Sequence, residues 1–394
     1  MFIDAMMLGL IGAPNKGKST IFSAMTLSQA DIADYPFTTI NPNLGIAHAT
    51  KECPEKELGI KCNPRNSMCG NGIRKIPVNI TDVAGLIPGA HIGKGMGTQF
   101  LNDIISADAL ILVVDLSGET DIQGRPGSNF DQKEDIHMVE EELANWLSGI
   151  IEKNMQSLSR KKDGIEALLE LLSGFKPSED QIRDSAEENG ITISNISWNH
   201  ESSLRFSRSF LARNKPIAIA ANKMDKAPKD ALETLRNRLK DYPVIGCSGA
   251  IELALRRAAK SGTITYNPGE SNFIMGPNAT EDQKRALSYI SSYLKKNGST
   301  GIQEIINETV FNLSHSIVVY PVENENRYSD SSGNVLPDAI LMPEGSTALD
   351  LASKIHTEIA AKMLYAIDAK NKMRIAKDYI LKDGDIIKIV SAAK

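Results

Sequence analysis

The sequence predicts an α/β fold built around a mostly parallel sheet. Short apolar runs alternate with helix-like stretches, which is the pattern of strands joined by crossover helices. The apolar runs cover residues 6 to 11, 43 to 47, 76 to 81, 109 to 115, 216 to 221 and 243 to 247. The first of them leads directly into a glycine-rich loop. With 394 residues, the chain has room for about two to three domains.

Two regions depart from this alternation. Between residues 118 and 212 the apolar side chains recur at helical spacing, which predicts an inserted helical subdomain. From residue 316 onward, strand-like runs surround a short helix that Thr347 and Asp350 are expected to cap, which predicts a small α+β module. The expected domains are a main α/β domain from 1-117 and 213-315, a helical insertion from 118-212 and a C-terminal module from 316-394.

The composition excludes several classes of protein. A balance of 44 Lys+Arg against 49 Asp+Glu gives a net charge of -5, so we expect no DNA partner, and any RNA contact must be local. No apolar run reaches the 18 or so residues of a membrane helix, so no membrane partner is expected. Four cysteines argue against a disulfide framework and favour a reducing, cytoplasmic setting. The sequence leaves the oligomeric state open and favours a monomer.

A phosphate-binding loop follows the first strand. Residues 12 to 19 fit the pattern G-x-x-x-x-G-K-[ST], and a helix opens directly behind them. In such a loop the glycines let backbone amides converge on phosphates, while Lys18 can reach the β/γ oxygens and the Ser19 hydroxyl can ligate Mg²⁺. The candidate nucleotide-binding residues here are Gly12, Pro14, Asn15, Lys16, Gly17, Lys18, Ser19 and Thr20.

Three further segments complete a candidate site for a guanine nucleotide. Asp82 ends a strand and could hold Mg²⁺ through water, and the amide of Gly85 could meet a γ-phosphate. A later strand ends in Asn222-Lys223-Met224-Asp225, whose last carboxylate can accept both N–H donors of guanine, a pair that adenine lacks. The next strand is followed by Ser248-Gly249-Ala250, where a backbone amide, foremost that of Ala250, could contact guanine O6.

Together these segments resemble those of an Obg-related, YchF-like GTPase of the translation-factor-related class. Residues 35 to 43 look like the first switch of that family, and residues 82 to 91 look like its second. Residues 316 to 394 are similar to a TGS domain, a β-grasp module. The resemblance implies a P-loop G domain that binds GTP or GDP with Mg²⁺. It also implies that Thr39, with Thr38 as the weaker choice, is the switch ligand of Mg²⁺ that senses the γ-phosphate.

The sequence departs from the Ras-like pattern at Leu86, where many GTPases place the glutamine that orients water. The resemblance therefore implies a hydrophobic-substituted GTPase with slow intrinsic turnover, in which backbone, water or a monovalent cation assists. Asn15 matches the loop asparagine that coordinates K⁺ in related enzymes, and simple hydrogen bonding within the loop is its alternative role. The catalytic candidates are Lys18, Thr39 and Gly85, and the metal candidates are Ser19, Thr39 and Asp82.

A second departure concerns the choice of base. Bacterial and eukaryotic YchF-like members lack the N-K-x-D form and can prefer ATP, whereas Asn222, Lys223 and Asp225 favour GTP in this chain. We therefore expect an enzyme that hydrolyses GTP to GDP and phosphate as a slow molecular switch. The resemblance implies action with the ribosome or RNA in translation or ribosome assembly. The alternative is a nucleotide-gated protein-binding module whose hydrolysis is incidental.

A second group of residues could bind metal. His48, Cys53, Cys62 and Cys69 lie between the first switch and the strand before Asp82, and they are the donor types of a Cys₃His zinc site. Their spacings of 5, 9 and 7 match no strong zinc pattern. A zinc site and a long β-hairpin loop with reduced thiols both remain open at this point.

Overall fold

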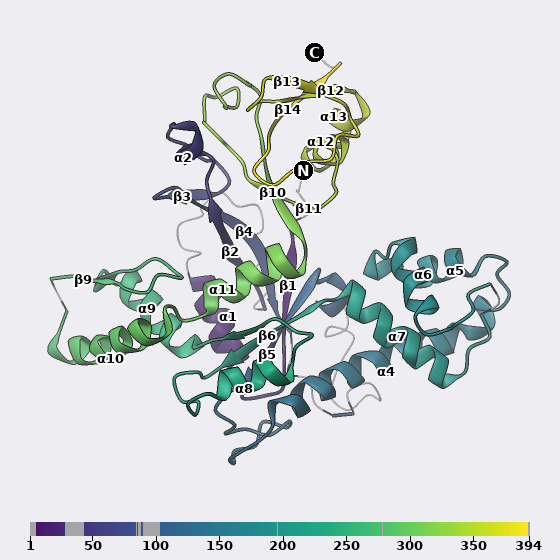
Figure 1. Ribbon diagram of the computed structural model, residues 1–394, viewed down its shortest axis with the longest axis horizontal. Helices are drawn as coiled ribbons and strands as arrows, with labels where there is room; N and C mark the ends of the chain where they lie inside the picture. Colours follow the sequence, from purple (N-terminus) through teal and green to yellow (C-terminus); the bar gives the residue numbers. More distant parts are fainter. Residues whose placement is uncertain are drawn as a thin grey trace. The chain divides into compact units, whose positions relative to one another are not determined.

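The computed structural model describes residues 5–27, 43–83, 85, 88–89, 103–194, 196–277 and 279–392. The chain forms two compact units, shown in Figure 1. The larger unit comprises Met7–Leu27 and Ile80–Ile305, and the smaller comprises Met1–Met6, Ser28–Asn79 and Ile306–Lys394. None of the described helices is long and apolar enough to cross a membrane.

The larger unit is built on the predicted parallel sheet, in the order β4-β1-β5-β6-β7. Strands β1 and β5, β5 and β6, and β6 and β7 pair in parallel. All residues of β5 are buried, as expected for a central strand covered on both faces. The strands are β1 (Met7–Ile11), β5 (Ala109–Asp115), β6 (Ile217–Asn222) and β7 (Val244–Gly246), together with the end of β4 (Ile73–Asp82).

The helical insertion lies between β5 and β6, as the apolar spacing predicts. Its two long helices, α4 and α7, pack on each other, and α4 also contacts β5. Side chains in α4 that recur at helical spacing, among them Ile136, Val139 and Leu143, join the core that includes β5 and β6. The insertion consists of α4 (Gln132–Leu158), α5 (Gly164–Leu171), η3 (Ser173–Phe175), α6 (Glu179–Glu187) and α7 (His200–Asn214).

The remaining helices of the larger unit follow the sheet strands. Helix α1 packs against α9, and α8 contacts β7. A separate apolar cluster joins Ile251 and Leu255 of α9 to Leu287 and Leu294 of α10. These elements are α1 (Lys18–Thr26), α8 (Ala231–Arg238), α9 (Gly249–Lys260), β8 (Ile264–Thr265), β9 (Ile274–Met275), α10 (Glu281–Asn297) and α11 (Ile302–Asn307), of which the last continues into the smaller unit.

The C-terminal part of the smaller unit is a five-stranded sheet in the order β11-β10-β14-β12-β13. Strands β10 and β14 are parallel, and the other pairs are antiparallel. Thr347 and Asp350 form the expected capping box of α12. The elements are η4 (Glu308–Leu313), β10 (Ser316–Pro321), β11 (Ile340–Pro343), α12 (Ala348–Ile355), α13 (Thr357–Ala361), β12 (Met363–Asp368), β13 (Met373–Ile375) and β14 (Ile386–Ser391).

The same unit contains a strand pair from the N-terminal third of the chain. Strand β2 (Leu44–Glu52) neighbours β4 in the sheet. Strand β3 (Met68–Gly70) pairs with β4 in antiparallel fashion. The short helix α2 (Glu55–Leu58) lies in the connection between β2 and β3. The fold is therefore the predicted P-loop α/β fold with a helical insertion and a C-terminal β-grasp module. The boundaries at 117/118, 212/213 and 315/316 are proposed domain limits.

Gly301 lies close to the backbone at the end of β7, so a side chain at this position would test the packing against that strand. Its φ is +77°, and a Cβ at this position would lie 1.9 Å from the backbone oxygen of Gly246, at the end of β7. Gly298 also has a positive φ, of +82°, but a Cβ there would meet nothing within 4 Å. We expect Gly298→Ala to lower the free energy of unfolding by about 1 kcal/mol, through backbone strain alone. Gly301→Ala should cost about 1–3 kcal/mol more because β7 must move.

Urea unfolding followed by tryptophan fluorescence measures this difference. Trp146 and Trp198, the two tryptophans of the chain, both pack against the core of the larger unit. Equal losses of stability in the two variants would show that the approach of Gly301 to β7 is not a constraint.

Candidate nucleotide-binding site

The phosphate-binding loop between β1 and α1 is closely packed at two glycines. At Gly12, where φ is +144°, a Cβ would lie 2.6 Å from the carbonyl oxygen of Val113 in β5. At Gly17, where φ is +91°, a Cβ would lie 2.2 Å from Nδ2 of Asn222 at the end of β6. Any larger residue at these positions would push the loop away from the strand ends. The glycines of the motif thus set the position of the loop as well as its flexibility.

Three predicted phosphate and metal residues meet at the start of α1. The Ser19 hydroxyl donates to Oδ2 of Asp82 at 2.9 Å, and Lys18 Nζ lies 3.4 Å from Oδ1 of the same carboxylate. That Oδ1 atom is buried and has no hydrogen-bond partner among the described residues. A hydroxyl beside a carboxylate offers the oxygen ligands that Mg²⁺ prefers. This donor set therefore fits a magnesium ion.

Asn222 connects three loops at the opposite side of the phosphate loop. Its side chain is buried, its Nδ2 donates to the carbonyl of Lys16 at 2.8 Å, and its Oδ1 accepts from the amide of Gly249 at 3.1 Å. In the neighbouring loop, the Ser248 hydroxyl donates to Oδ1 of Asp225 at 2.6 Å. The two predicted base-recognition segments are therefore held together, and the Asp225 carboxylate is fixed in position.

Lys223 extends away from this junction toward the end of β5. Its Nζ lies 2.8 Å from Oδ2 of Asp115, and this oxygen also accepts a hydrogen bond from Thr120, while Oδ1 accepts one from Ser117. Burial acts to raise the pKa of Asp115, but the hydrogen bond from Lys223, those from Ser117 and Thr120 and the charge of Lys223 outweigh it, so the pKa lies below its usual value. Sequence reasoning missed Asp115, although a carboxylate at the end of an otherwise apolar strand was a visible signal.

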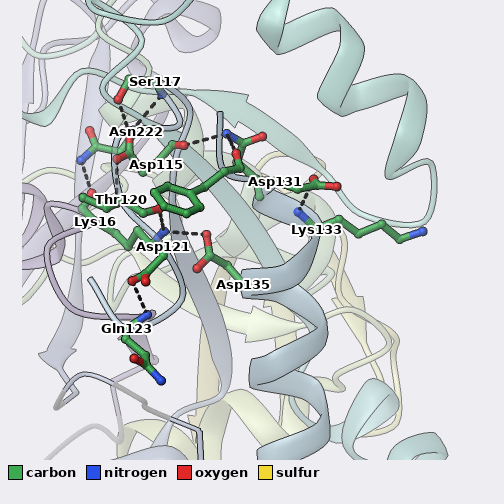
Figure 2. A network of polar contacts seen from close by, with 12 residues as sticks. Lys16, Asp115, Ser117, Thr120, Asp121, Gln123, Asp131, Lys133, Asp135 and Asn222 are labelled. Carbon is green, nitrogen blue, oxygen red and sulfur yellow. Dashed lines mark hydrogen bonds and ion pairs between the residues drawn. The ribbon is translucent and has the colours of Figure 1, made fainter. Parts of the chain in front are cut away.

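The phosphate loop is also tied to the helical insertion, as Figure 2 shows. The side chain of Lys16 is 1% exposed, and its Nζ lies 2.9 Å from Oδ2 of Asp135 in α4. The same Nζ donates to the carbonyl of Thr120 at 2.8 Å. Beside it, Asn15 Nδ2 donates to the carbonyl of Gly124 at 2.8 Å. Two adjacent residues of the loop are thus anchored to the segment that opens the insertion.

Some predicted site residues are placed and others are not. Gly85 lies next to the phosphate loop, where a Cβ would be 3.4 Å from the ring of Pro14. The exposed Ala250 is the second residue of α9, two residues beyond Ser248. Thr38, Thr39 and Leu86 lie outside the described residues. Thr20 lies in the first turn of α1, one residue beyond Ser19.

The buried Lys16–Asp135 pair predicts an unusual pH dependence of stability. Burial raises the pKa of Asp135 to about 6, against the opposing effect of Lys16. Folded protein therefore holds a proton on Asp135 at pH values where the unfolded chain has released it, so stability falls as the pH rises from about 4 to 6. Asp135→Asn removes this slope. When the pH rises from 5 to 7, the free energy of unfolding of the variant should increase by about 1 kcal/mol relative to that of wild type.

Urea unfolding at pH 5, 6 and 7 provides the measurement. Glu187→Gln is the control, because it removes the same charge from an exposed position of the insertion, in α6, that does not act on Asp135, and it should keep the wild-type slope. If the Asp135→Asn and wild-type curves run parallel across this range, Asp135 does not titrate there.

Comparison with known proteins agrees with this geometry. Three family models match: 50S ribosome-binding GTPase over residues 7–161, "Obg-like GTPase YGR210-like, G4 motif-containing domain" over 220–324, and TGS domain over 332–391. The second of these ranges contains the Asn222 to Asp225 segment.

Two relatives extend over nearly the whole chain, and a third matches about half of it. An uncharacterised GTP-binding protein of Methanocaldococcus jannaschii is 51% identical over 393 residues, which is 98% of this chain and 100% of the relative. A solved GTP-binding protein of Pyrococcus horikoshii is 37% identical with a TM-score of 0.80, over 98% of this chain and 100% of that one. The ribosome-binding ATPase YchF of Bacillus subtilis is 31% identical over 222 residues, 55% of this chain and 56% of that protein. The chain therefore belongs to the Obg-related, YchF-like P-loop GTPases with a C-terminal TGS domain.

Proposed function

We propose that this protein binds GTP with Mg²⁺ and hydrolyses it to GDP and phosphate as a slow molecular switch. The observation that carries the proposal is the meeting of Lys18, Ser19 and Asp82 on one side of the phosphate loop while Asn222 joins the base-recognition loops to its other side. A triphosphate bound along this loop would have its phosphates at the first group and its base at the second.

Each predicted residue has a physical role in this reaction. Lys18 and the loop amides would stabilise charge on the β- and γ-phosphates. Ser19 and Thr39 would hold Mg²⁺ directly, with Asp82 contacting it through water, and the ion would neutralise developing charge on the phosphate oxygens. The amide of Gly85 would meet the γ-phosphate. Because Leu86 cannot orient water, backbone groups, water or K⁺ held by Asn15 would take over that task.

Recognition of guanine would fall mainly to Asp225. Both polar atoms of the Asn222 side chain already serve contacts within the protein, so we assign Asn222 to positioning the loops. Asp225 keeps one carboxylate oxygen engaged by Ser248, which fixes its orientation toward a base. Lys223 would support the same pocket through its pair with Asp115. The backbone amide of Ala250 would reach guanine O6.

Asp225→Asn should change nucleotide preference from GTP to xanthosine triphosphate. The carboxylate accepts from N1–H and the 2-amino group of guanine, whereas an asparagine amide accepts from N1–H and donates to the 2-oxo group of xanthine. A hydrogen bond to a charged group contributes about 1.5–3 kcal/mol, so GTP affinity should fall roughly 10- to 100-fold. Equilibrium titration with fluorescent nucleotide analogues measures both affinities.

Asp241→Asn is the control for this substitution. Asp241 is exposed on the same unit, so the variant loses the same charge without touching the site and should bind GTP as wild type does. Unchanged preference in Asp225→Asn would overturn the assignment of Asp225.

We further propose that the partner of the switch is the ribosome or RNA, in translation or ribosome assembly. One family model that matches the chain describes a 50S ribosome-binding GTPase, and the Bacillus subtilis relative is named a ribosome-binding ATPase. The helical insertion and the TGS module would provide the contact surfaces, and the protein would act in the cytoplasm. The alternative is a partner protein whose binding is selected by the bound nucleotide.

Co-sedimentation with ribosomes and their subunits should show binding with a non-hydrolysable GTP analogue and little with GDP or without nucleotide. The Asp225→Asn variant supplies a strict control, because it should sediment with ribosomes when given the xanthosine analogue and not when given the guanosine analogue at the same concentration. Absence of wild-type binding in every nucleotide state would instead favour a protein partner.

A further inference from the structure

Three of the four cysteines converge on one carboxylate in the smaller unit. The Sγ atoms of Cys53, Cys62 and Cys69 and a carboxylate oxygen of Glu55 all lie within 4.8 Å of one another. Two separations within the group are 3.9 Å, between the sulfurs of Cys53 and Cys62, and 3.3 Å, between the Cys69 sulfur and Glu55 Oε1. His48, which the sequence offered as a fourth ligand, is not part of this group.

These separations match a tetrahedral zinc site. Zinc binds cysteine sulfur at about 2.3 Å and carboxylate oxygen at about 2.0–2.2 Å. Ligand atoms at the corners of such a tetrahedron lie about 3.5–3.8 Å apart, so one ion can contact all four side chains once the separations, each at most 4.8 Å, close by up to about 1 Å. Three thiols and one carboxylate also fill the coordination shell completely, which is typical of a structural site and not of a catalytic one.

Hydrogen bonds and strand pairing hold the ligands in place. The amide of Cys53 donates to the carbonyl of Gly72 at 2.9 Å, and Cys69 lies in β3, opposite Arg74 of β4. The amide of Cys62 donates to Oε2 of Glu55 at 2.9 Å, which leaves Oε1 directed at the thiol of Cys69. The ligand set is therefore organised by contacts that do not themselves require an ion.

A positive charge lies beside the cluster. Arg74 is fully buried, and its guanidinium donates to Ser67 at 3.0 Å and to the carbonyl of Leu336 at 2.6 Å. Three thiolates and a carboxylate around Zn²⁺ carry a net charge of -2, and a buried cation on the neighbouring strand offsets part of it. The position of Arg74 thus favours the ionised form of the site.

The segment that carries the cluster has no apolar core of its own. Between residues 53 and 69, only Cys53, Pro54 and Cys62 are buried. Its regular structure is the single turn α2 and the start of β3. A short loop without an apolar core commonly needs a metal or a disulfide to define one conformation.

We propose that Cys53, Glu55, Cys62 and Cys69 bind one structural Zn²⁺ ion. The ion would fix the loop that joins β2 to β3. This loop makes backbone contacts with a distant part of the same unit: the amide of Asn63 donates to Val335 at 3.1 Å, and that of Arg65 donates to Pro337 at 2.8 Å. Zinc would therefore also hold the segment that precedes β11. This proposal is independent of the candidate nucleotide site, whose described residues lie in the larger unit.

The test is the metal content of the purified full-length protein, measured by inductively coupled plasma mass spectrometry. We expect one zinc per chain in wild type and in Cys247→Ser, which removes a buried thiol of the larger unit. Cys62→Ser should lose the metal. Glu55→Gln should retain three thiolate ligands and bind zinc more weakly than wild type.

Cobalt gives a second readout that needs no variant. Metal-free wild-type protein titrated with Co²⁺ under reducing conditions should develop thiolate-to-cobalt charge-transfer absorption and the visible bands of tetrahedral cobalt, with saturation at one ion per chain. If Cys62→Ser does not fold, this titration still decides the question. The proposal is overturned if wild type contains no stoichiometric zinc and gives no such spectrum, or if mass mapping finds Cys53 and Cys62 joined in a disulfide in freshly purified protein.

Discussion

The nucleotide site depends on one buried side chain, that of Asn222. Its amide joins the carbonyl of Lys16 in the phosphate loop to the backbone amide of Gly249 at the start of α9. A buried amide that lost either partner would leave polar groups unsatisfied, at a cost of about 1–3 kcal/mol each. The phosphate loop and the proposed base-recognition loops therefore cannot shift independently of each other. The lack of a side chain at Gly17 is what lets Asn222 come this close.

The helical insertion is part of the same arrangement. Lys16 extends from the phosphate loop to Asp135 in α4 and to the carbonyl of Thr120, and all of these groups are buried. A buried ion pair adds little net stability, because desolvation offsets most of the attraction, but it strongly disfavours any geometry that separates its members. The pair thus sets where α4 begins relative to the phosphate loop. A force applied to the insertion by a partner would reach the nucleotide through this contact.

The sequence predicted those features whose signal is local. The parallel strands, the phosphate loop and the capping box at Thr347 each arise from residues a few positions apart, so their patterns can be read directly. Asp135 and Thr120 were missed because they contact Lys16 from more than 100 residues away, and nothing in their own neighbourhood marks them. Glu55 was missed for a related reason. It joins the cysteine cluster only because the turn of α2 directs its side chain toward Cys62. The spacing of the cysteines in the sequence does not indicate this contact.

Three lysine–aspartate pairs surround the site, and their differences indicate which lysine can serve the nucleotide. Lys16 is 1% exposed and is held by a second hydrogen bond, and Lys223 pairs at 2.8 Å with an aspartate that two hydroxyls also stabilise. Lys18 is paired at 3.4 Å, the longest of the three separations. Exchanging that weak contact for phosphate oxygens costs least, because the aspartate left behind keeps the Ser19 hydroxyl and can face a metal ion. Of the three lysines, Lys18 therefore has the weakest structural contact, which leaves it available to bind the phosphates of the substrate.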